Sequence, residues 1–557
     1  MRARPPVARL FPPAYALLLS LAVTAPLLAP GYLLLRDAVS TPRSYLTDAA
    51  MGLSEAAPRA LPQDFAVALA SALLDGGVVV KLLLIGGLWL AGWGAARLSA
   101  AVLPDAGPAG QCVAVTVAVW NPYVAERLLQ GHWSLLVGYG CLPWVATTML
   151  RLRGGASWSA LGALAFWIAL AGLTPTGVML AATVALVCVA APGAGLARWR
   201  SAAATLVFAA VAALPWLTAA VMARSLSSSQ AEGVEAFAAR AEPGLGTLLS
   251  LAGLGGIWNA DAVPGSRTTL FAIVATAVLL GVVILGLPTA LRRPQTVPLL
   301  LLGAGAVVVP ALMATDSGLA AVEAVIRTLP GLGVVRDGQK WVALAVPGYA
   351  LAGAAAVLTV RRVPAAATAA VCCTALIATL PDLAWGVGGS VRAVQYPPGW
   401  TAVAEMINAD PRPVAVLPVD SMRQFAWAGD APVLDPLPRW VRADVLMTGD
   451  LNVGDHTVPG EGERARAVQD LLLDGAGAER LAQAGVGWVV VESPSRSAVL
   501  TLPVAYRDDD IALYRVGGSA PRAGGRALVL TAHLAWLALL IGGLVGLAAG
   551  VRRSARG

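Results

Sequence analysis

Long apolar runs constrain this chain more than any other feature of its sequence. Of its 557 residues, 57% are hydrophobic and only 13% are charged, whereas roughly a quarter of the residues of soluble globular proteins are charged. A helix that spans a bilayer needs about 20 mostly apolar residues. Roughly twelve runs approach this requirement, near residues 12–33, 77–97, 108–122, 133–150, 156–173, 176–193, 201–222, 268–290, 296–314, 341–360, 364–382 and 525–550. The sequence therefore predicts a polytopic α-helical membrane protein.

Basic residues between the runs predict how the chain crosses the membrane. The net charge is +7, and only two of the 39 basic residues, Lys81 and Lys340, are lysines. If all twelve runs span the bilayer, seven arginine clusters fall on one face: Arg2/Arg4/Arg9, Arg97, Arg151/Arg153, Arg198/Arg200, Arg292/Arg293, Arg361/Arg362 and Arg552/Arg553/Arg556. The positive-inside rule makes that face cytoplasmic. Both termini are then cytoplasmic, and the arginines indicate topology rather than binding to nucleic acid.

The N-terminal segment and the cysteines bear on two further features, a cleaved signal peptide and a cysteine-based disulfide or metal site. The first run begins with basic residues, as a signal peptide does, but it is longer than a usual signal core. We therefore expect an uncleaved first helix. All five cysteines lie in apolar runs, so we expect neither a disulfide framework nor a CxxC metal site.

The longer polar stretches fall on the opposite, outer face. The connections on the cytoplasmic face are short and consist mostly of Arg, Gly and Pro. The main outer stretches are residues 34–76, 122–133, 223–267, 315–340 and 383–523. We therefore expect any chemistry to take place on the outer face.

The first outer stretch begins within the sequence GYLLLRDAVSTPRSYLTD at residues 31–48, which contains Arg36, Asp37 and Asp48. Charges at membrane depth are costly and therefore indicate function, although Arg36 and Asp37 could equally mark the membrane interface. Further along, residues 57–76 carry apolar side chains at helical spacing, at Phe65, Ala66, Leu69, Leu73 and Leu74. This pattern predicts a helix lying along the outer membrane surface.

Two short motifs bring more polar groups to the outer membrane boundary. NPYVAERLLQGHW, at residues 121–133, contains Glu126 and Gln130 at i, i+4 spacing on one helix face, with Arg127 about 100° away and His132 following. Either these residues cap a tight hairpin or they line a substrate pocket, and His132 alone is typical of an interfacial hydrogen-bonding residue rather than a metal ligand.

VVRDGQKW, at residues 334–341, is the second motif and directly precedes the tenth apolar run. Its polar residues are Arg336, Asp337, Gln339 and Lys340. Lys340 and Lys81 both fall at the outer interface, where they either bind lipid phosphate or are ordinary snorkelling lysines.

Residues 383–523 predict a separate outer domain of α/β type. Runs rich in valine at 414–419 and 486–492, and IALYRV at 511–516, are typical of strands, and residues 462–485 have a helical pattern. The domain contains no GxGxxG, P-loop or HExxH motif. The predicted organisation is a transmembrane core at 1–382, this domain at 383–523, and a final helix with a cytoplasmic tail at 524–557.

The acidic outer motif after the first helix, the surface helix and the C-terminal outer domain together resemble the GT-C superfamily of membrane glycosyltransferases. GYLLLRDAVSTP and NPYVAERLLQGHW are most similar to segments of the arabinofuranosyl- and mannosyltransferases of actinobacterial envelopes. The resemblance covers the first four predicted spans well and the whole architecture loosely. It implies a GT-C-like core that transfers a sugar from a polyprenyl-phosphate donor to an envelope glycan or lipid.

The resemblance also implies roles for particular residues. An acidic residue of the first outer loop is the catalytic base in that superfamily, which corresponds here to Asp37, with Asp48 as a second candidate. Arg36, Arg127 and Lys340 are the candidate cations for the leaving phosphate, and the other polar residues of the two motifs are candidates for substrate binding. The adjacent acidic pair of some members is absent, so a requirement for a divalent cation such as Mg²⁺ or Mn²⁺ stays open.

Two other functional classes are alternatives. A transporter or lipid flippase often has two similar halves and charges at mid-membrane depth, and neither feature is evident here. A non-catalytic envelope assembly protein with the same architecture would have a very similar sequence, because fold alone does not establish function.

Overall fold

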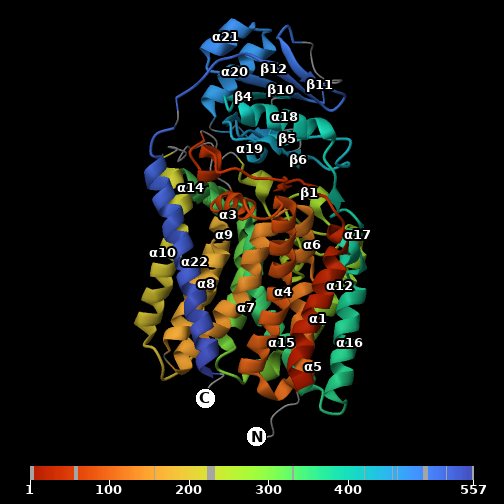
Figure 1. Ribbon diagram of the computed structural model, residues 1–557. Coiled ribbons are helices and arrows are strands. Elements are labelled where there is room, and N and C mark those ends of the chain that lie inside the picture. The colour runs from red at the N-terminus through yellow and green to blue at the C-terminus, as the bar shows by residue number, and fades with distance from the viewer. Residues whose placement is uncertain are drawn as a thin grey trace.

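The computed structural model of the chain describes residues 6–54, 60–155, 157–222, 233–328, 332–418, 421–453, 456–458, 460, 462–493, 500–521 and 523–554. A bundle of long helices carries a β-sheet region on one end (Figure 1). The start of α1 (Pro6–Thr24) and the end of α22 (Arg526–Ser554) both lie at the other end of the bundle. The first and last described residues therefore lie on one side of the bundle, and the assignment of that side to the cytoplasm stays a prediction.

Each of the twelve predicted runs contains a helix. Besides α1 and α22, these helices are α4 (Gly76–Val102), α5 (Gly107–Val119), α7 (Trp133–Gly154), α8 (Trp158–Ala171), α9 (Pro175–Cys188), α10 (Arg198–Met222), α12 (Phe271–Leu291), α13 (Val297–Met313), α15 (Val346–Thr359) and α16 (Ala365–Ala378).

Not all of these helices are long enough to be counted as membrane spans. Within the described residues, seven helical segments are long and apolar enough to cross a membrane, or nine if each of two bent pairs counts as one span. The pairs are α13 with α14 (Asp316–Thr328), bent by 92°, and α16 with the segment Pro381–Gly388, bent by 75°. The 14 residues of α8 or α9 extend over only about 21 Å. The chain is a multi-pass membrane protein, and the count of twelve spans stays a prediction.

Small residues allow the helices of the bundle to pack closely, as is common in membranes. A Cβ atom on Gly140 of α7 would lie 2.2 Å from the carbonyl oxygen of Gly87 on α4. At the other side of the bundle, a Cβ atom on Gly162 of α8 would lie 2.8 Å from the Cα atom of Gly546 on α22. The close α4–α7 contact supports the end of α7 from which the polar residues His132 and Gln130 extend.

The first apolar run does not remain helical to residue 33, so this part of the prediction is wrong. Helix α1 ends at Thr24, a 3-10 turn follows at Ala25–Leu28, and residues Tyr32–Leu35 form strand β1. Pro26 and Pro30 lack the N–H group that a continuing helix needs. The chain therefore leaves the helix about two turns earlier than its hydrophobicity indicates.

Strand β1 is the central strand of a small three-stranded sheet. It pairs antiparallel with β2 (Ala38–Val39) and with β3 (Ala393–Val394). Arg36 and Asp37, expected at the end of a membrane helix, instead form the turn between β1 and β2.

The sheet region, residues 393–516, contains a five-stranded sheet in the order β11-β12-β10-β4-β7. Its strands are β4 (Val414–Leu417), β7 (Val445–Leu446), β10 (Trp488–Glu492), β11 (Val504–Arg507) and β12 (Ile511–Arg515). Strands β4, β7 and β10 are parallel, and β12 is antiparallel to its neighbours. The three strand runs predicted from the sequence contain β4, β10 and β12.

Helices and two hairpins complete the sheet region. They are α18 (Pro398–Ala409), α19 (Leu437–Trp440), α20 (Glu463–Leu473), α21 (Ala478–Gln483), the pair β5 (Met422–Arg423) with β6 (Val433–Leu434), and the pair β8 (Leu451–Val453) with β9 (His456–Val458). Leu34 and Val39 of the first loop belong to the same hydrophobic core as Trp400 and Val433. The proposed boundary at residue 383 therefore leaves out a part of the chain that packs with this region.

The predicted surface helix in the first loop is shorter than expected. Helix α3 covers only Gln63–Ala70, and residues 55–59 of the first loop lie outside the described residues. Phe65 is buried, and the centre of its ring lies 4.5 Å from the centre of the His533 ring on α22. Leu73 and Leu74 follow the helix and are exposed. Its placement along a membrane surface stays a prediction.

Candidate functional site

Asp37 lies at the tip of the hairpin that β1 and β2 form. Leu35 pairs with Ala38, which leaves Arg36 and Asp37 as a two-residue turn. Arg36 has a φ of 48°, and turns of this length need a positive φ at one or both positions. That conformation costs a non-glycine residue about 1–2 kcal/mol, so the surrounding contacts must hold it in place.

The side chain of Arg36 supplies such contacts and is buried. Its Nη1 donates to the carbonyl oxygen of Leu129 and its Nη2 to that of Asp261, each at 2.7 Å. The guanidinium thus joins the hairpin to the end of α6 and to the loop that contains Asp261. This structural role corrects the expectation that Arg36 is a cation for the substrate phosphate.

Gly131 allows the loop after α6 (Pro122–Leu129) to approach the hairpin. It has a φ of +83°, and a Cβ atom there would lie 2.4 Å from the carbonyl oxygen of Leu35 and 2.3 Å from the nitrogen of Ala38. Only glycine satisfies both conditions. The close approach brings the neighbouring residues Gln130 and His132 to Asp37.

The carboxylate of Asp37 is held through one of its two oxygens. Gln130 Nε2 donates to Oδ2 at 2.9 Å, and His132 Nε2 lies 3.1 Å from the same atom. Burial opposes ionisation of Asp37, but the contacts with His132 and Gln130 and the charge of Lys340 together outweigh it and lower the pKa of this carboxyl. The side chain of Asp37 is 42% exposed, so an ionised carboxylate reaches the surface.

His132 connects Asp37 to a buried arginine. Its Nδ1 lies 3.1 Å from Arg127 Nη1. Burial is the main cause of its lowered pKa, and the charges of Arg127 and Lys340 add to it despite the contact with Asp37. His132 is therefore neutral at neutral pH.

Arg127 is fully buried and forms a two-pronged ion pair with Asp337. Nη1 donates to Oδ2 at 2.9 Å and Nη2 to Oδ1 at 3.0 Å. Arg127 and Lys340 outweigh the effect of burial and lower the pKa of Asp337. Lys340 Nζ lies 3.7 Å from Asp337 Oδ2 on a side chain that is 23% exposed. The pair thus joins two sequence motifs that lie 210 residues apart.

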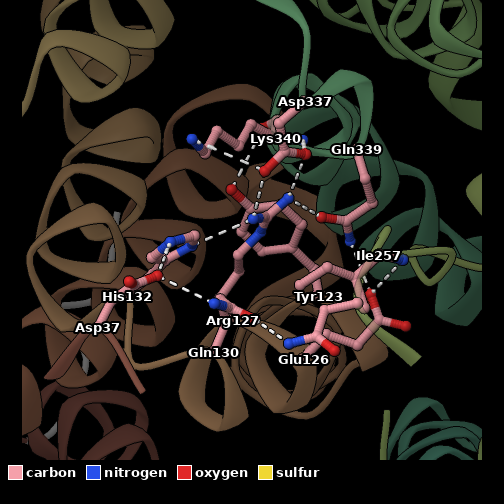
Figure 2. A network of polar contacts seen from close by, with 11 residues as sticks. Asp37, Tyr123, Glu126, Arg127, Gln130, His132, Ile257, Asp337, Gln339 and Lys340 are labelled. Atoms are coloured by element: carbon pink, nitrogen blue, oxygen red, sulfur yellow. Dashed lines mark hydrogen bonds and ion pairs between the residues drawn. The ribbon is translucent and has the colours of Figure 1, made fainter. Parts of the chain in front are cut away.

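Glu126 turns away from Asp37 and binds a third loop. It accepts hydrogen bonds from the backbone N–H groups of Gly256 at 3.1 Å and Ile257 at 3.2 Å, and from Gln339 Nε2 at 2.9 Å. Gln339 also accepts from Arg127 through its Oε1. Figure 2 shows that these contacts form one network that extends from Asp37 to Glu126.

The sequence indicated most of this network but missed its link to the loop at 233–267. Asn259 Nδ2 donates to Gln130 Oε1 at 2.8 Å and so fixes the amide that binds Asp37. The nearby carboxylate of Glu242 pairs with Arg267, and both side chains are buried. The only signal for Asn259 is a polar residue in an outer loop, which many other positions share.

Two predicted site residues lie elsewhere. Asp48 begins the short helix α2 (Asp48–Met51), and its Oδ1 accepts from Arg526 Nη1 at 3.0 Å. The guanidinium carbon of Arg336 lies 4.1 Å from the centre of the Phe237 ring, and Arg336 lines a small hollow together with Pro310. Among the contacts described above, neither residue reaches Asp37.

The sequence offered, as one of two alternatives, a substrate pocket lined by the polar residues of the 121–133 motif. Glu126, Arg127 and Gln339 are fully buried. They hold the other residues of the network in place and do not line an open space. Among the members of the network, Asp37, His132 and Lys340 reach the surface. A bound molecule would therefore meet these three side chains.

The described residues contain no group of three or more His, Cys, Asp or Glu side chains that could hold a metal ion. Around Asp37, the neighbouring groups of Gln130 and His132 point nitrogen atoms at its Oδ2. Of the described acidic residues, Asp37 is the one in this network with substantial exposure.

Comparison with solved structures shows a similarity to a membrane arabinofuranosyltransferase. The arabinofuranosyltransferase AftD from Mycobacteria matches with a TM-score of 0.55 at 18% sequence identity, over 92% of this chain and 41% of that chain. No family model and no curated protein sequence matches the chain. The similarity confirms the GT-C-like fold that the sequence predicts, and the chain spans less than half the length of this neighbour.

Proposed function

We propose that the protein is a glycosyltransferase of the GT-C type in the plasma membrane. It transfers a sugar from a polyprenyl-phosphate donor to an envelope glycan or lipid on the outer face. The shared fold with an arabinofuranosyltransferase supports the class of reaction. The arginine clusters support an orientation in which Asp37 and the sheet region face outward.

The observation that carries this proposal is the difference between the two oxygens of Asp37. Oδ2 is occupied by Gln130 and His132. No group in the described parts of the chain donates a hydrogen bond to Oδ1, and the carboxylate is partly exposed. A lowered pKa keeps Asp37 ionised at neutral pH, so Oδ1 can accept a proton from a bound hydroxyl group.

The proposed reaction is a single displacement with inversion. The acceptor hydroxyl oxygen forms a bond to the anomeric carbon while the bond from that carbon to the donor phosphate breaks. The electron pair of the broken bond leaves with the phosphate, and the hydroxyl proton passes to Asp37 Oδ1 as general base.

Lys340 is the candidate partner of the leaving phosphate. Its charge acts on Asp37, and its partly exposed ammonium group has a single described ion pair, at 3.7 Å, to Asp337. A fixed cation next to the position where negative charge develops lowers the barrier to departure. Arg127 is too deeply buried for this role and instead holds His132 and Asp337.

Sugar transfer in reconstituted membranes, measured with Asp37→Asn and Asp48→Asn, tests the proposal. Asparagine keeps the size of Asp37 but cannot take up the proton, and general-base assistance is worth about 10² to 10⁴ in rate. We expect turnover to fall by that order in Asp37→Asn, with donor binding retained. Asp48→Asn is the matched control, because its carboxylate pairs with Arg526 outside the network.

Full turnover in Asp37→Asn would remove Asp37 from the mechanism. Absence of transfer by the wild type with every polyprenyl-phosphate sugar tried would instead favour a non-catalytic assembly protein. Binding of the donor without transfer would favour the same alternative.

A further inference from the structure

We propose that Arg36 is a positioning residue that ties Asp37 to the sheet region, which makes the sheet region a structural part of the active site. The inference rests on the proposed function, in which Asp37 is the base. It concerns how the residue before Asp37 is held, since Arg36 itself is buried and does not meet the substrate.

The first part of the argument is the side chain of Arg36. It donates to the carbonyl oxygens of Leu129 and Asp261, each at 2.7 Å. Leu129 ends α6 directly before Gln130, which binds the Asp37 carboxylate, and Asp261 lies two residues after Asn259, which binds Gln130. One guanidinium therefore fixes the hairpin tip relative to the loops that orient its carboxylate.

The second part is the backbone of Arg36. Its N–H group donates to the carbonyl oxygen of Pro432 at 2.8 Å, and its own carbonyl oxygen accepts from Leu434 at 2.9 Å. These bonds make a parallel bridge to Val433 on strand β6. In Figure 1, β1 lies at the base of the sheet region, between that region and the helical bundle.

The third part is the attachment of β6 to the larger sheet. Its hairpin partner β5 carries Arg423, which pairs with Glu492 at the end of β10 and lies 3.4 Å from Asp435, directly after β6. All three side chains are buried. Breaking a buried ion pair is costly, so the hairpin that holds Arg36 cannot shift independently of the sheet.

These contacts form an unbroken path from the five-stranded sheet to the residue beside Asp37. They also explain why an arginine occupies a position with positive φ. Its planar guanidinium can donate in two directions at once, whereas a lysine offers one compact ammonium group. The geometry of the turn is thus maintained from three separate parts of the chain.

The test compares Arg36→Gln with Arg153→Gln. Arg153 is a matched control because it is also buried and donates to backbone carbonyls, those of Ala191 and Gly193, but at the far end of α7. For each variant in reconstituted membranes we would measure kcat, the KM for donor, and amide hydrogen exchange of a peptide covering residues 32–39.

For Arg36→Gln we expect kcat to fall on the order of 10- to 100-fold, because a misplaced reacting group loses rate to this extent, while KM changes little. Amide exchange at residues 32–39 should become faster. Arg36→Lys keeps the positive charge but cannot donate to both carbonyl oxygens as the planar guanidinium does. It should have an intermediate kcat. Arg153→Gln should leave both kcat and the exchange of this peptide near the wild-type values.

Unchanged exchange at 32–39 in Arg36→Gln would overturn the inference, as would equal losses of kcat in Arg36→Gln and Arg153→Gln. If the wild type transfers no sugar, the proposed function fails, yet the exchange measurement still decides whether Arg36 anchors the hairpin. The two failures are therefore distinguishable.

Discussion

Arg127 Nη1 lies 3.1 Å from Nδ1 of His132, and this contact determines which ring nitrogen carries the proton. An arginine can only donate, so Nδ1 of the neutral ring accepts and the proton is on Nε2. That nitrogen lies 3.1 Å from Asp37 Oδ2 and therefore donates to the carboxylate. The buried Arg127–Asp337 pair thus sets the orientation of the proposed base through one imidazole ring.

The first prediction concerns the pH dependence of turnover. Loss of the donor in His132→Phe should raise the pKa of Asp37, because the hydrogen bond from His132 is the strongest of the contacts that lower it. A base acts in its ionised form, so the acid limb of kcat/KM should move to higher pH. At alkaline pH, where Asp37 is ionised in both proteins, kcat/KM should change less. The measurement is kcat/KM against pH for both proteins.

His533→Phe is the control for this change, since His533 is a buried histidine whose described contacts are with Val529 and Phe65 and not with Asp37. Its acid limb should coincide with that of the wild type. An unshifted limb in His132→Phe would show that His132 does not act on the base.

The second prediction concerns stability. Asp337→Asn leaves the buried Arg127 without its counter-ion and should destabilise the fold by about 3–5 kcal/mol, measured as a lower unfolding temperature in detergent. Glu323→Gln breaks the exposed pair with Arg327 and should cost about 1 kcal/mol or less.

The same ion pair gives a pH dependence of stability with a definite sign. The pKa of Asp337 is lower in the folded protein than in the unfolded chain. Its ionisation therefore stabilises the fold above the ordinary aspartate pKa, near 4, and this contribution is lost as the pH falls through the folded value. Between about pH 5 and 8 this group should contribute no change, and Asp337→Asn should lose the acid-dependent part.

The third prediction separates the backbone conformation of Gly131 from its close packing. Gly131 and Gly107 both have positive φ, but only Gly131 would place a Cβ atom against backbone, at Leu35 and Ala38. Gly131→Ala should therefore displace the hairpin tip and lower turnover by about 10²-fold. Gly107→Ala should show the conformational cost alone, of about 1 kcal/mol in stability. Similar turnover in the two variants would contradict a tight fit between this loop and Asp37.

Much of the network could be predicted because polar and charged groups at a membrane boundary are few. Arg127, Asp337, Gln339 and Lys340 stand out in an apolar sequence, and a boundary position already limits where they can lie. The pairing of Arg127 with Asp337 could not be predicted, because it depends on how α6 packs against a segment 210 residues away. The complete burial of the Glu126 side chain could not be predicted for the same reason, since its partners include backbone groups of another loop.

The hairpin at Asp37 could not be predicted from sequence patterns. Residues Tyr32–Leu35 are apolar, and a short apolar run does not distinguish a strand from the end of a helix. The partners that make it a strand include Ala393 and Val394, more than 350 residues later in the sequence. The role of Arg36 depends on the same distant contacts, so its charge alone indicated a phosphate-binding cation.

The fourth prediction tests membrane orientation. Thr401, in α18, and Gly155, after α7, are exposed at opposite ends of the structure, and the native cysteines are buried apart from partly exposed Cys112. In a Cys112→Ser background, a membrane-impermeant maleimide should label Thr401→Cys in intact cells. Gly155→Cys should be labelled only after permeabilisation. The reverse pattern would place Asp37 in the cytoplasm and exclude a donor presented on the outer leaflet.

The last prediction compares the two lysines of the chain. Lys81 donates to the carbonyl oxygen of Ala29 at 2.7 Å and is buried, which is a structural role. Lys340 pairs with Asp337 at 3.7 Å but is partly exposed, so a bound anion can approach its ammonium group. Lys340→Met should lower kcat/KM by about 10² to 10³, as removal of one group that stabilises developing charge does elsewhere. Lys81→Met should affect stability more than turnover.

The assay is sugar transfer at several donor concentrations, together with the unfolding temperature of each variant. Equal turnover in Lys340→Met and the wild type would remove Lys340 from the leaving-group site and leave that charge to be stabilised by another group.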